Sequence, residues 1–180
     1  MFCRPAFNEA ARGWSLSAPL FSPHLCHSWS PADGAFLYTR PQSVVGIWWP
    51  LEKCTTSNGC LWVVPGSHVR PVTRRFKRSS GAAAAAGALT EFEPPEAEEF
   101  DTTGAVPLEM AAGGAVLLHA GVVHYSEANT SAQSRHAYSI HIVEGGKGVE
   151  YPNDNWLQRA DGALFPALYS SESCGAAGPG

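Results

Sequence analysis

The stretch VVGIWWPLEKCTTSNGCLWVVPG, residues 44–66, decides the fold class of this chain. Its first eight residues form a continuous apolar run rich in β-branched and aromatic side chains, which is typical of a buried strand. Asn58-Gly59 is a tight-turn signal, and residues 60–64 form a second apolar run that a Pro-Gly pair ends. The stretch therefore predicts two short strands separated by turn residues.

Short strands separated by turns continue along the rest of the chain. Residues 36–39 and 115–118 form two more strand candidates, the second of them after a Gly-Gly turn. In residues 135–143 (RHAYSIHIV) the side chains alternate, which predicts a further strand. One face carries Arg135, Ala137, Ser139 and His141, and the other carries His136, Tyr138, Ile140 and Ile142. This pattern predicts an all-β sandwich or jelly roll.

Three segments lack the strand pattern. Residues 1–32 hold scattered prolines and aromatics without a sustained period, and residues 170–180 are mostly Ser, Gly and Ala, so both are expected to be irregular. Residues 74–100 change from basic through alanine-rich to acidic, which predicts a long low-complexity excursion with at most a turn or two of helix. Since 180 residues suffice for one domain, we expect a single β domain over residues 33–169 that contains this insertion.

The composition argues against several classes of protein. Only 16% of the residues are charged, and 12 basic against 16 acidic residues give a net charge of −4, which argues against a nucleic-acid-binding face. No apolar run approaches the roughly 20 residues that a membrane-spanning helix needs. The five cysteines are odd in number and contain no C-x-x-C pair, so we expect free thiols in a reducing, cytoplasmic compartment rather than a zinc ribbon. An organellar transit peptide is the alternative, because Arg4 and Arg12 lie in an N-terminal segment without an apolar signal core.

The seven histidines are candidate ligands of a transition metal, but their spacing alone selects no site. His119 and His124 lie five residues apart, which places them on opposite faces of a straight strand, and His136 and His141 are related in the same way. The chain contains no H-E-x-x-H, G-x-S-x-G or P-loop motif. The readings as a serine hydrolase or a nucleotide hydrolase therefore lack support.

Arg135 is the most informative charged residue of the predicted strands. An arginine that pointed into a β-sandwich would bury an unpaired charge, so such a side chain calls for an anionic partner. Ala137 and Ser139 beside it leave room for a small carboxylate, which arginine binds in a bidentate manner. The alternative is a half-exposed strand whose Arg135 faces solvent.

Three motifs resemble those of the phytanoyl-CoA dioxygenase family. Residues 58–68 (NGCLWVVPGSH) resemble its NG-x-L-x-x-x-PGSH signature, and residues 117–129 (LLHAGVVHYSEAN) followed by SRHAY resemble its H-x-S-x-x-N motif with a downstream arginine. Residues 154–158 and 165–169 resemble the C-terminal segment of one subgroup. The resemblance covers residues 33–169 apart from the excursion, and it implies a double-stranded β-helix, which is a form of jelly roll.

The resemblance implies an Fe(II)- and 2-oxoglutarate-dependent dioxygenase. Such an enzyme uses O₂ to hydroxylate a small, lipid-like or acyl-type substrate and releases succinate and CO₂. Asp33 and His124 would be metal ligands in a site of two histidines and one carboxylate. Arg135 would pair with the C5 carboxylate of 2-oxoglutarate, Ser126 would hydrogen-bond this co-substrate, and Trp48 would line its pocket.

The chain departs from the family pattern at the first metal ligand. A histidine is expected two residues before Asp33, and this position holds Pro31, which has no metal-binding side chain. His27 or His24 could supply the missing ligand by looping back to the metal. Alternatively, the jelly roll is N-terminally incomplete, and the chain is a non-catalytic relative that keeps the Arg135 pocket without iron. A cupin-like enzyme with another metal is a third reading.

The remaining polar residues have ordinary structural explanations. We expect His68 to set the Pro-Gly-Ser-His turn, and His119 and His141 to take part in packing or a polar network. A basic cluster is expected in a solvated loop, or alternatively at the mouth of the site, where it would hold an anionic group of the substrate. Its members are Arg70, Arg74, Arg75, Lys77 and Arg78.

Overall fold

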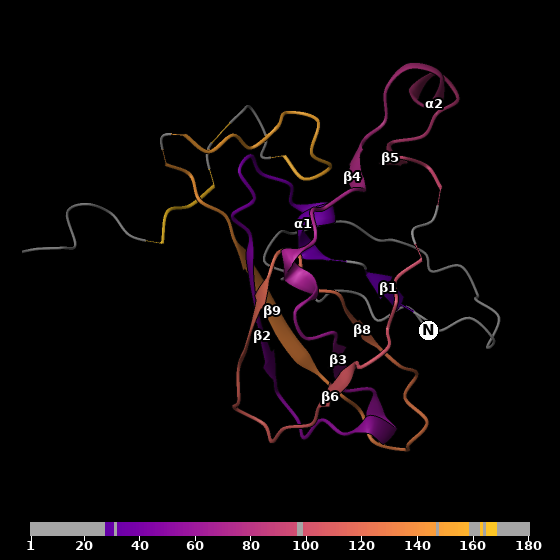
Figure 1. Cartoon of the computed structure of the whole chain (residues 1–180), viewed down its shortest axis with the longest axis vertical. Helices are drawn as coiled ribbons and strands as arrows, with labels where there is room; N and C mark the ends of the chain where they lie inside the picture. Colours follow the sequence, from indigo (N-terminus) through magenta and orange to yellow (C-terminus); the bar gives the residue numbers. More distant parts are fainter. Residues whose placement is uncertain are drawn as a thin grey trace, which may run out of the picture.

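The computed structural model describes residues 28–30, 32–96, 99–146, 148–158, 163 and 165–168 of the chain. Two antiparallel sheets form its body (Figure 1). The first sheet has the strand order β1-β8-β3-β6, and the second has the order β7-β2-β9. The strands are β1 (Ser28–Ser30), β2 (Val45–Pro50), β3 (Leu61–Val63), β6 (Val106–Leu108), β7 (Val116–His119), β8 (His124–Ser126) and β9 (Ala137–Ile142).

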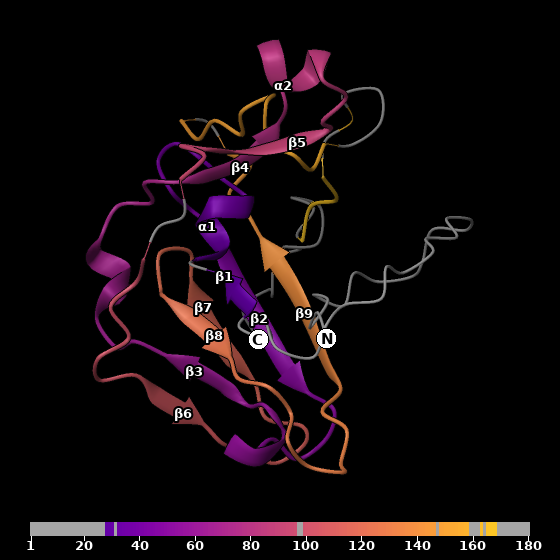
Figure 2. The same ribbon diagram turned by 90° about the vertical axis from the view of Figure 1, so that its right-hand side faces the viewer.

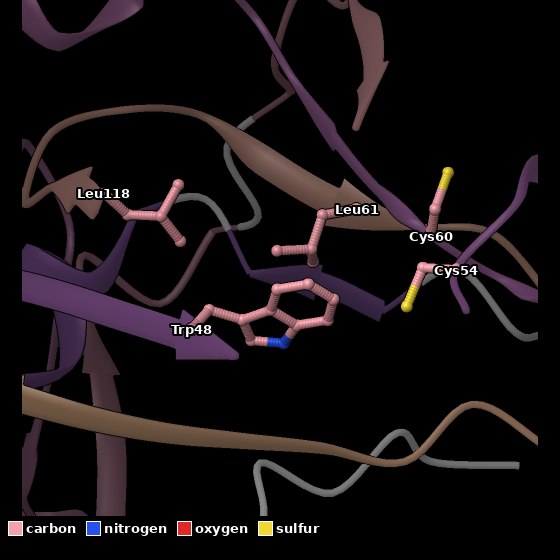
Figure 3. Close-up of a cluster of buried hydrophobic side chains, with 5 residues drawn as sticks. All are labelled: Trp48, Cys54, Cys60, Leu61 and Leu118. Carbon is pink, nitrogen blue, oxygen red and sulfur yellow. The ribbon is translucent and has the colours of Figure 1, made fainter. Parts of the chain in front are cut away.

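The two sheets face each other across a shared core. Figure 2 shows β2 and β9 side by side, with β3, β6 and β8 in the opposite layer. Trp48 of β2 and Leu118 of β7 pack in one buried cluster with Leu61 of β3 and with the free thiols Cys54 and Cys60 (Figure 3). Because this cluster draws on both sheets, their inner faces form one hydrophobic core, as in a jelly roll. The predicted all-β jelly-roll fold is confirmed.

The stretch that decided the fold class forms β2 and β3, with the 3₁₀ turn η1 (Thr56–Asn58) between them. Gly59 follows the turn with φ 86°, in the left-handed region that favours glycine. A Cβ atom at this position would lie 2.9 Å from the carbonyl oxygen of Glu127. The Asn58 side chain accepts a hydrogen bond from the Thr55 amide (2.7 Å) and donates one to the Lys53 carbonyl (2.8 Å). The Asn-Gly signal therefore marks a turn that needs both residue types.

The prediction of a strand at residues 36–39 is wrong. The chain instead forms the single helical turn α1 (Asp33–Phe36), in which the Leu37 amide donates to the Asp33 carbonyl (3.0 Å). The Gly34 amide donates to the carbonyl of Ala120, which follows β7, so the turn is fixed to the three-stranded sheet (2.9 Å). This contact joins residues far apart in the chain, so the local sequence pattern of residues 36–39 could not predict it.

The excursion at residues 74–100 contains a hairpin rather than irregular chain alone. Strands β4 (Arg75–Arg78) and β5 (Thr90–Glu93) pair with each other, and the short helix α2 (Gly81–Ala85) lies at the tip (Figure 1). The basic and acidic blocks are opposite strands, since Arg75 lies across from Glu93 and Lys77 across from Glu91. Their opposite charges make favourable cross-strand pairs. Phe76 and Phe92 also pack against Phe36 of α1, with ring centroids 5.5 and 5.9 Å away.

The segment expected to be irregular at the N-terminus contributes one strand. β1 pairs antiparallel with β8, so that Ser30 lies across from His124. The prediction for Pro31, and those for His24 and His27, concern positions outside the described residues. The predicted tail at residues 170–180 lies outside them as well. Within the part of the chain that the structure describes, no helix is long and apolar enough to cross a membrane.

Candidate active site

Asp33 lies where the two sheets and α1 meet. It is the first residue of α1, and only 9% of its surface is exposed. Its Oδ1 atom lies 3.7 Å from Nε2 of His124 on β8 and 3.2 Å from Nε2 of His141 on β9. The structure thus brings together the two predicted metal ligands, Asp33 and His124, and adds a second imidazole.

A backbone contact orients His124, and a glycine makes room for Asp33. Nδ1 of His124 lies 3.0 Å from the carbonyl oxygen of Val122, which fixes the ring so that Nε2 faces Asp33. Gly46 of β2 makes room for the carboxylate, since a Cβ atom there would lie 2.5 Å from Oδ2 of Asp33. This Oδ2 atom is buried, and it has no hydrogen-bond partner among the described residues.

The neighbouring histidines lower the pKa of Asp33. Burial alone would raise the pKa of Asp33, but the contact with His141 and the charges of His124 and His141 outweigh burial and hold this pKa below its usual value. The carboxylate is therefore ionised at neutral pH. A buried anion with one unpartnered oxygen is a suitable donor for a cation.

A second polar group lies further along the same inner face. Nη2 of Arg135 donates a hydrogen bond to Oγ of Ser126 (2.9 Å), and Oγ donates in turn to the Gly59 carbonyl (2.8 Å). The Arg135 guanidinium also lies over the Trp48 ring, 5.8 Å from its centroid. The structure therefore joins Arg135, Ser126 and Trp48, the three residues predicted to bind the co-substrate. The Arg135 side chain is half-buried, and its guanidinium is directed at Ser126 and Trp48.

The two polar groups are connected by the alternation of the strands. His124 and Ser126 lie two residues apart on β8, and both are buried. On β2, Gly46 and Trp48 have the same spacing, and they pair with His141 and Ser139 of β9. Two residues of strand advance about 7 Å. His124, which faces Asp33, and Ser126, which faces Arg135, are therefore about 7 Å apart along β8.

The described residues contain only part of a metal site. Among them, no group of three or more His, Cys, Asp or Glu side chains has an arrangement that could hold a metal ion. Asp33 and His124 offer the carboxylate and imidazole donors that non-haem iron uses. Their chemistry fits such an ion, while the positions of Pro31, His27 and His24 lie outside the described residues. Iron binding therefore stays a prediction.

The neighbourhood of His141 beside Asp33 was not recognised from the sequence. We expected His141 in a packing or polar network, and the structure places it in polar contact with the predicted metal ligand. One signal was present in the sequence, because His141 lies on the same face of its strand as Arg135. The spacing could not show that α1 would place Asp33 beside that face.

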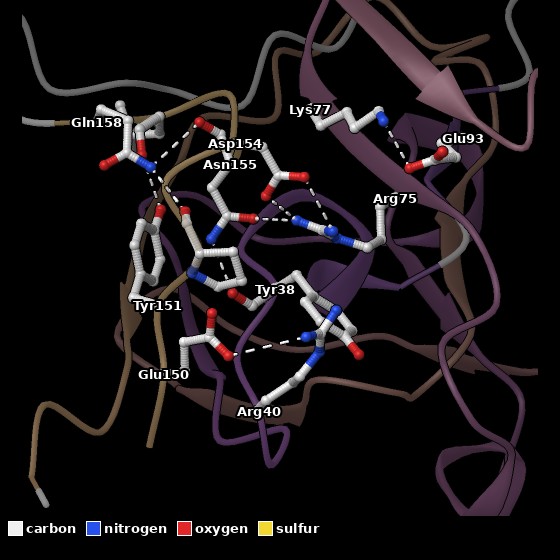
Figure 4. A network of polar contacts seen from close by, with 12 residues as sticks. Tyr38, Arg40, Arg75, Lys77, Glu93, Glu150, Tyr151, Asp154, Asn155 and Gln158 are labelled. Atoms are coloured by element: carbon white, nitrogen blue, oxygen red, sulfur yellow. Dashed lines mark hydrogen bonds and ion pairs between the residues drawn. The ribbon is translucent and has the colours of Figure 1, made fainter. Parts of the chain in front are cut away.

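The basic cluster is held by its own neighbours. Arg75 makes two hydrogen bonds to Asp154, and Lys77 pairs with Glu93 (Figure 4). Only 15% of the Arg75 side chain and 12% of the Lys77 side chain are exposed. Arg74 donates to the carbonyls of the two prolines that follow β5. The prediction of a solvated loop is therefore wrong for Arg75 and Lys77.

The family model of phytanoyl-CoA dioxygenase (PhyH) matches residues 16–137. The chain belongs to the phytanoyl-CoA dioxygenase family. The match confirms the predicted family, and it begins before residue 33, where we expected the family pattern to start. The subgroup suggested by the C-terminal motifs is phytanoyl-CoA dioxygenase domain-containing protein 1, and the chain is similar to proteins of that name.

Two curated relatives and one solved structure illustrate the similarity. Phytanoyl-CoA dioxygenase domain-containing protein 1 of Danio rerio is 45% identical over 139 residues, which are 77% of this chain and 46% of the relative. Phytanoyl-CoA dioxygenase of Arabidopsis thaliana is 43% identical over 128 residues, or 71% of this chain and 44% of the relative. The chain thus spans about half the length of the curated relatives it matches. The crystal structure of EvdO2 from Micromonospora carbonacea var. aurantiaca complexed with 2-oxoglutarate is 24% identical, with a TM-score of 0.47 over 69% of this chain and 47% of that one.

Proposed function

We propose that this chain carries the site of an Fe(II)- and 2-oxoglutarate-dependent dioxygenase that hydroxylates a small or lipid-like substrate. Membership of the phytanoyl-CoA dioxygenase family supports the dioxygenase class. The observation that carries the proposal is the arrangement of two polar groups on one inner face, Asp33 with His124 and Arg135 with Ser126. A metal at the first group and a carboxylate at the second would place a dicarboxylate between them.

The residues would divide the work as follows. Asp33 and His124 would hold the iron, which when bound supplies the activation of O₂. Arg135 and Ser126 would bind the far carboxylate of 2-oxoglutarate, because an arginine and a hydroxyl both donate to carboxylate oxygens. The Trp48 ring, which is 8% exposed, would cover the co-substrate and exclude water from this end of the site.

Binding of 2-oxoglutarate tests the second group. Isothermal titration of the whole chain with 2-oxoglutarate should give saturable binding, and Arg135→Leu should weaken it at least about tenfold because a charge-assisted bond contributes 1.5–3 kcal/mol. Arg70→Leu is the control, since Arg70 is exposed and belongs to neither polar group. If the wild type binds no 2-oxoglutarate, or if both variants behave alike, the proposal is wrong.

Turnover separates the enzyme from a second candidate function. Pro31 stands at the position of the first family histidine, which favours a relative that binds the dicarboxylate without iron chemistry. Succinate formation with added Fe(II), O₂ and a candidate acyl-type substrate supports the dioxygenase. Binding of 2-oxoglutarate without any succinate supports the non-catalytic relative. A cytoplasmic location remains part of the proposal.

A further inference from the structure

We propose that His141 is a positioning residue for the Asp33 carboxylate, and that it holds Oδ1 so that Oδ2 remains available to a metal. This inference rests on the proposed function. His141 approaches the carboxylate more closely than the predicted ligand His124 does, at 3.2 Å against 3.7 Å. It belongs to β9, whereas Asp33 belongs to α1 and His124 to β8, so a third element fixes the carboxylate.

The strand register places His141 where it can do this. His141 pairs directly with Gly46, which is flanked by β9 on one side and β7 on the other. A Cβ atom at Gly46 would lie 3.5 Å from Cδ2 of His141 and 2.5 Å from Oδ2 of Asp33. The space that glycine leaves open is therefore the space in which the imidazole and the carboxylate meet.

The two carboxylate oxygens have different surroundings. Oδ1 faces both imidazoles, whereas Oδ2 is buried without a hydrogen-bond partner among the described residues. A carboxylate that binds a metal through one oxygen is commonly fixed by a hydrogen bond that its other oxygen accepts. We assign His141 to the carboxylate rather than to the metal, because its Nε2 atom lies within hydrogen-bonding distance of Oδ1, at 3.2 Å.

If His141 served packing alone, a side chain of similar volume could replace it. A leucine would fill a similar volume, but it would leave a buried, ionised carboxylate with less compensation. A glutamine would keep an N–H donor near Oδ1 while removing the imidazole nitrogen that could ligate a metal. The two substitutions therefore separate positioning from packing and from direct ligation.

The test is the affinity of the whole chain for Co(II), measured by anaerobic titration and by the visible spectrum of the bound ion. His141→Leu should weaken binding 10- to 100-fold, the usual effect of losing a group that orients a ligand, and His141→Gln should lose less than about tenfold. His136→Gln is the matched control, because His136 is exposed and contacts Glu52 rather than Asp33. Wild-type affinity in His141→Leu, or an equal loss in both His141 variants, would overturn the proposal.

A measurement without metal keeps this proposal separate from the proposed function. If the wild type binds no Co(II), the predicted metal site fails, and the contact with Asp33 is then judged by ¹⁵N NMR of the metal-free protein. A slowly exchanging Nε2–H of His141 supports the positioning contact, and a rapidly exchanging one overturns it. The spectrum of the wild type suffices for this decision even where the leucine variant does not fold.

Discussion

The inner face of the two sheets and the β4–β5 hairpin both carry charged side chains, but they differ in how completely these charges are paired. At the hairpin, Arg75 forms a bidentate pair with Asp154, with Nη–Oδ distances of 2.6 and 3.2 Å, and its guanidinium lies over the Tyr38 ring (Figure 4). On the inner face, the ionised carboxylate of Asp33 keeps one buried oxygen without a partner in the described part of the chain. The charges of Arg75 and Asp154 pair with each other in a contact that we call the clamp, whereas Asp33 lies where we propose that a metal binds.

Among the substitutions considered, Asp33→Asn should have the largest effect, and it should act on metal affinity at the inner face. The substitution removes the only anionic donor of the proposed metal site and keeps the shape of the side chain. Affinity for Co(II) or Fe(II) should therefore fall by more than about 100-fold, beyond the usual effect of losing an orienting group. Isothermal titration measures the affinity, and circular dichroism checks that the variant is folded. Retention of metal affinity would show that Asp33 is no ligand.

Gly46→Ala should break the inner face by crowding it. The new Cβ would lie 2.5 Å from Oδ2 of Asp33, so the carboxylate must move within a packed region. Overpacking of this kind costs about 1–3 kcal/mol, which urea unfolding measures. Gly145→Ala is the matched control, because among the described residues no atom other than those of its chain neighbours lies within 4 Å of the added Cβ. Equal stability of the two variants would contradict the close fit between Gly46 and Asp33.

Acidification should weaken the clamp through Asp154. The hydrogen bonds and charge of Arg75 hold the pKa of Asp154 below its usual value, so the pair stabilises the fold above the pKa of the unfolded chain. This stability is lost as the pH falls through the lower, folded-state pKa. Since the Asp154 side chain is 45% exposed, Asp154→Asn should cost only about 1 kcal/mol at pH 7.

The pH dependence supplies the control for this prediction. The difference between wild type and Asp154→Asn should shrink as the pH is lowered from 5 towards 2, because the wild-type carboxyl becomes neutral too. Urea unfolding at several pH values measures the difference. A difference that stays constant over this range would mean that Asp154 stabilises the clamp through packing rather than charge.

Local patterns predicted the strands but not the contacts between distant segments. The apolar run of β2, the Asn-Gly turn and the alternation of β9 are readable because period and turn chemistry are local properties. The same alternation placed Arg135 on one face of the strand predicted over residues 135–143, and the family resemblance named Asp33, His124, Ser126 and Trp48. The hairpin was missed because its stability comes from the pairing of residues 75–78 with residues 90–93 and from contact with Phe36. These segments are too far apart in the sequence for a local pattern to connect them. His141 was missed as a neighbour of Asp33 for the same reason.

The smallest effect is expected for Glu93→Gln at the solvent-facing rim of the hairpin. Glu93 pairs with Lys77 at 2.6 Å, but its side chain is 60% exposed, and Lys77 also lies 4.0 Å from Glu91. Exposed ion pairs contribute little because water and salt screen them, so the substitution should cost less than about 0.5 kcal/mol in urea unfolding. In 1 M NaCl, where the Debye length is about 3 Å, the difference from wild type should vanish. A larger or salt-independent loss of stability would mean that the Lys77–Glu93 pair stabilises the hairpin as much as the Arg75–Asp154 pair does. Glu93 would then belong to the clamp rather than to the solvated rim.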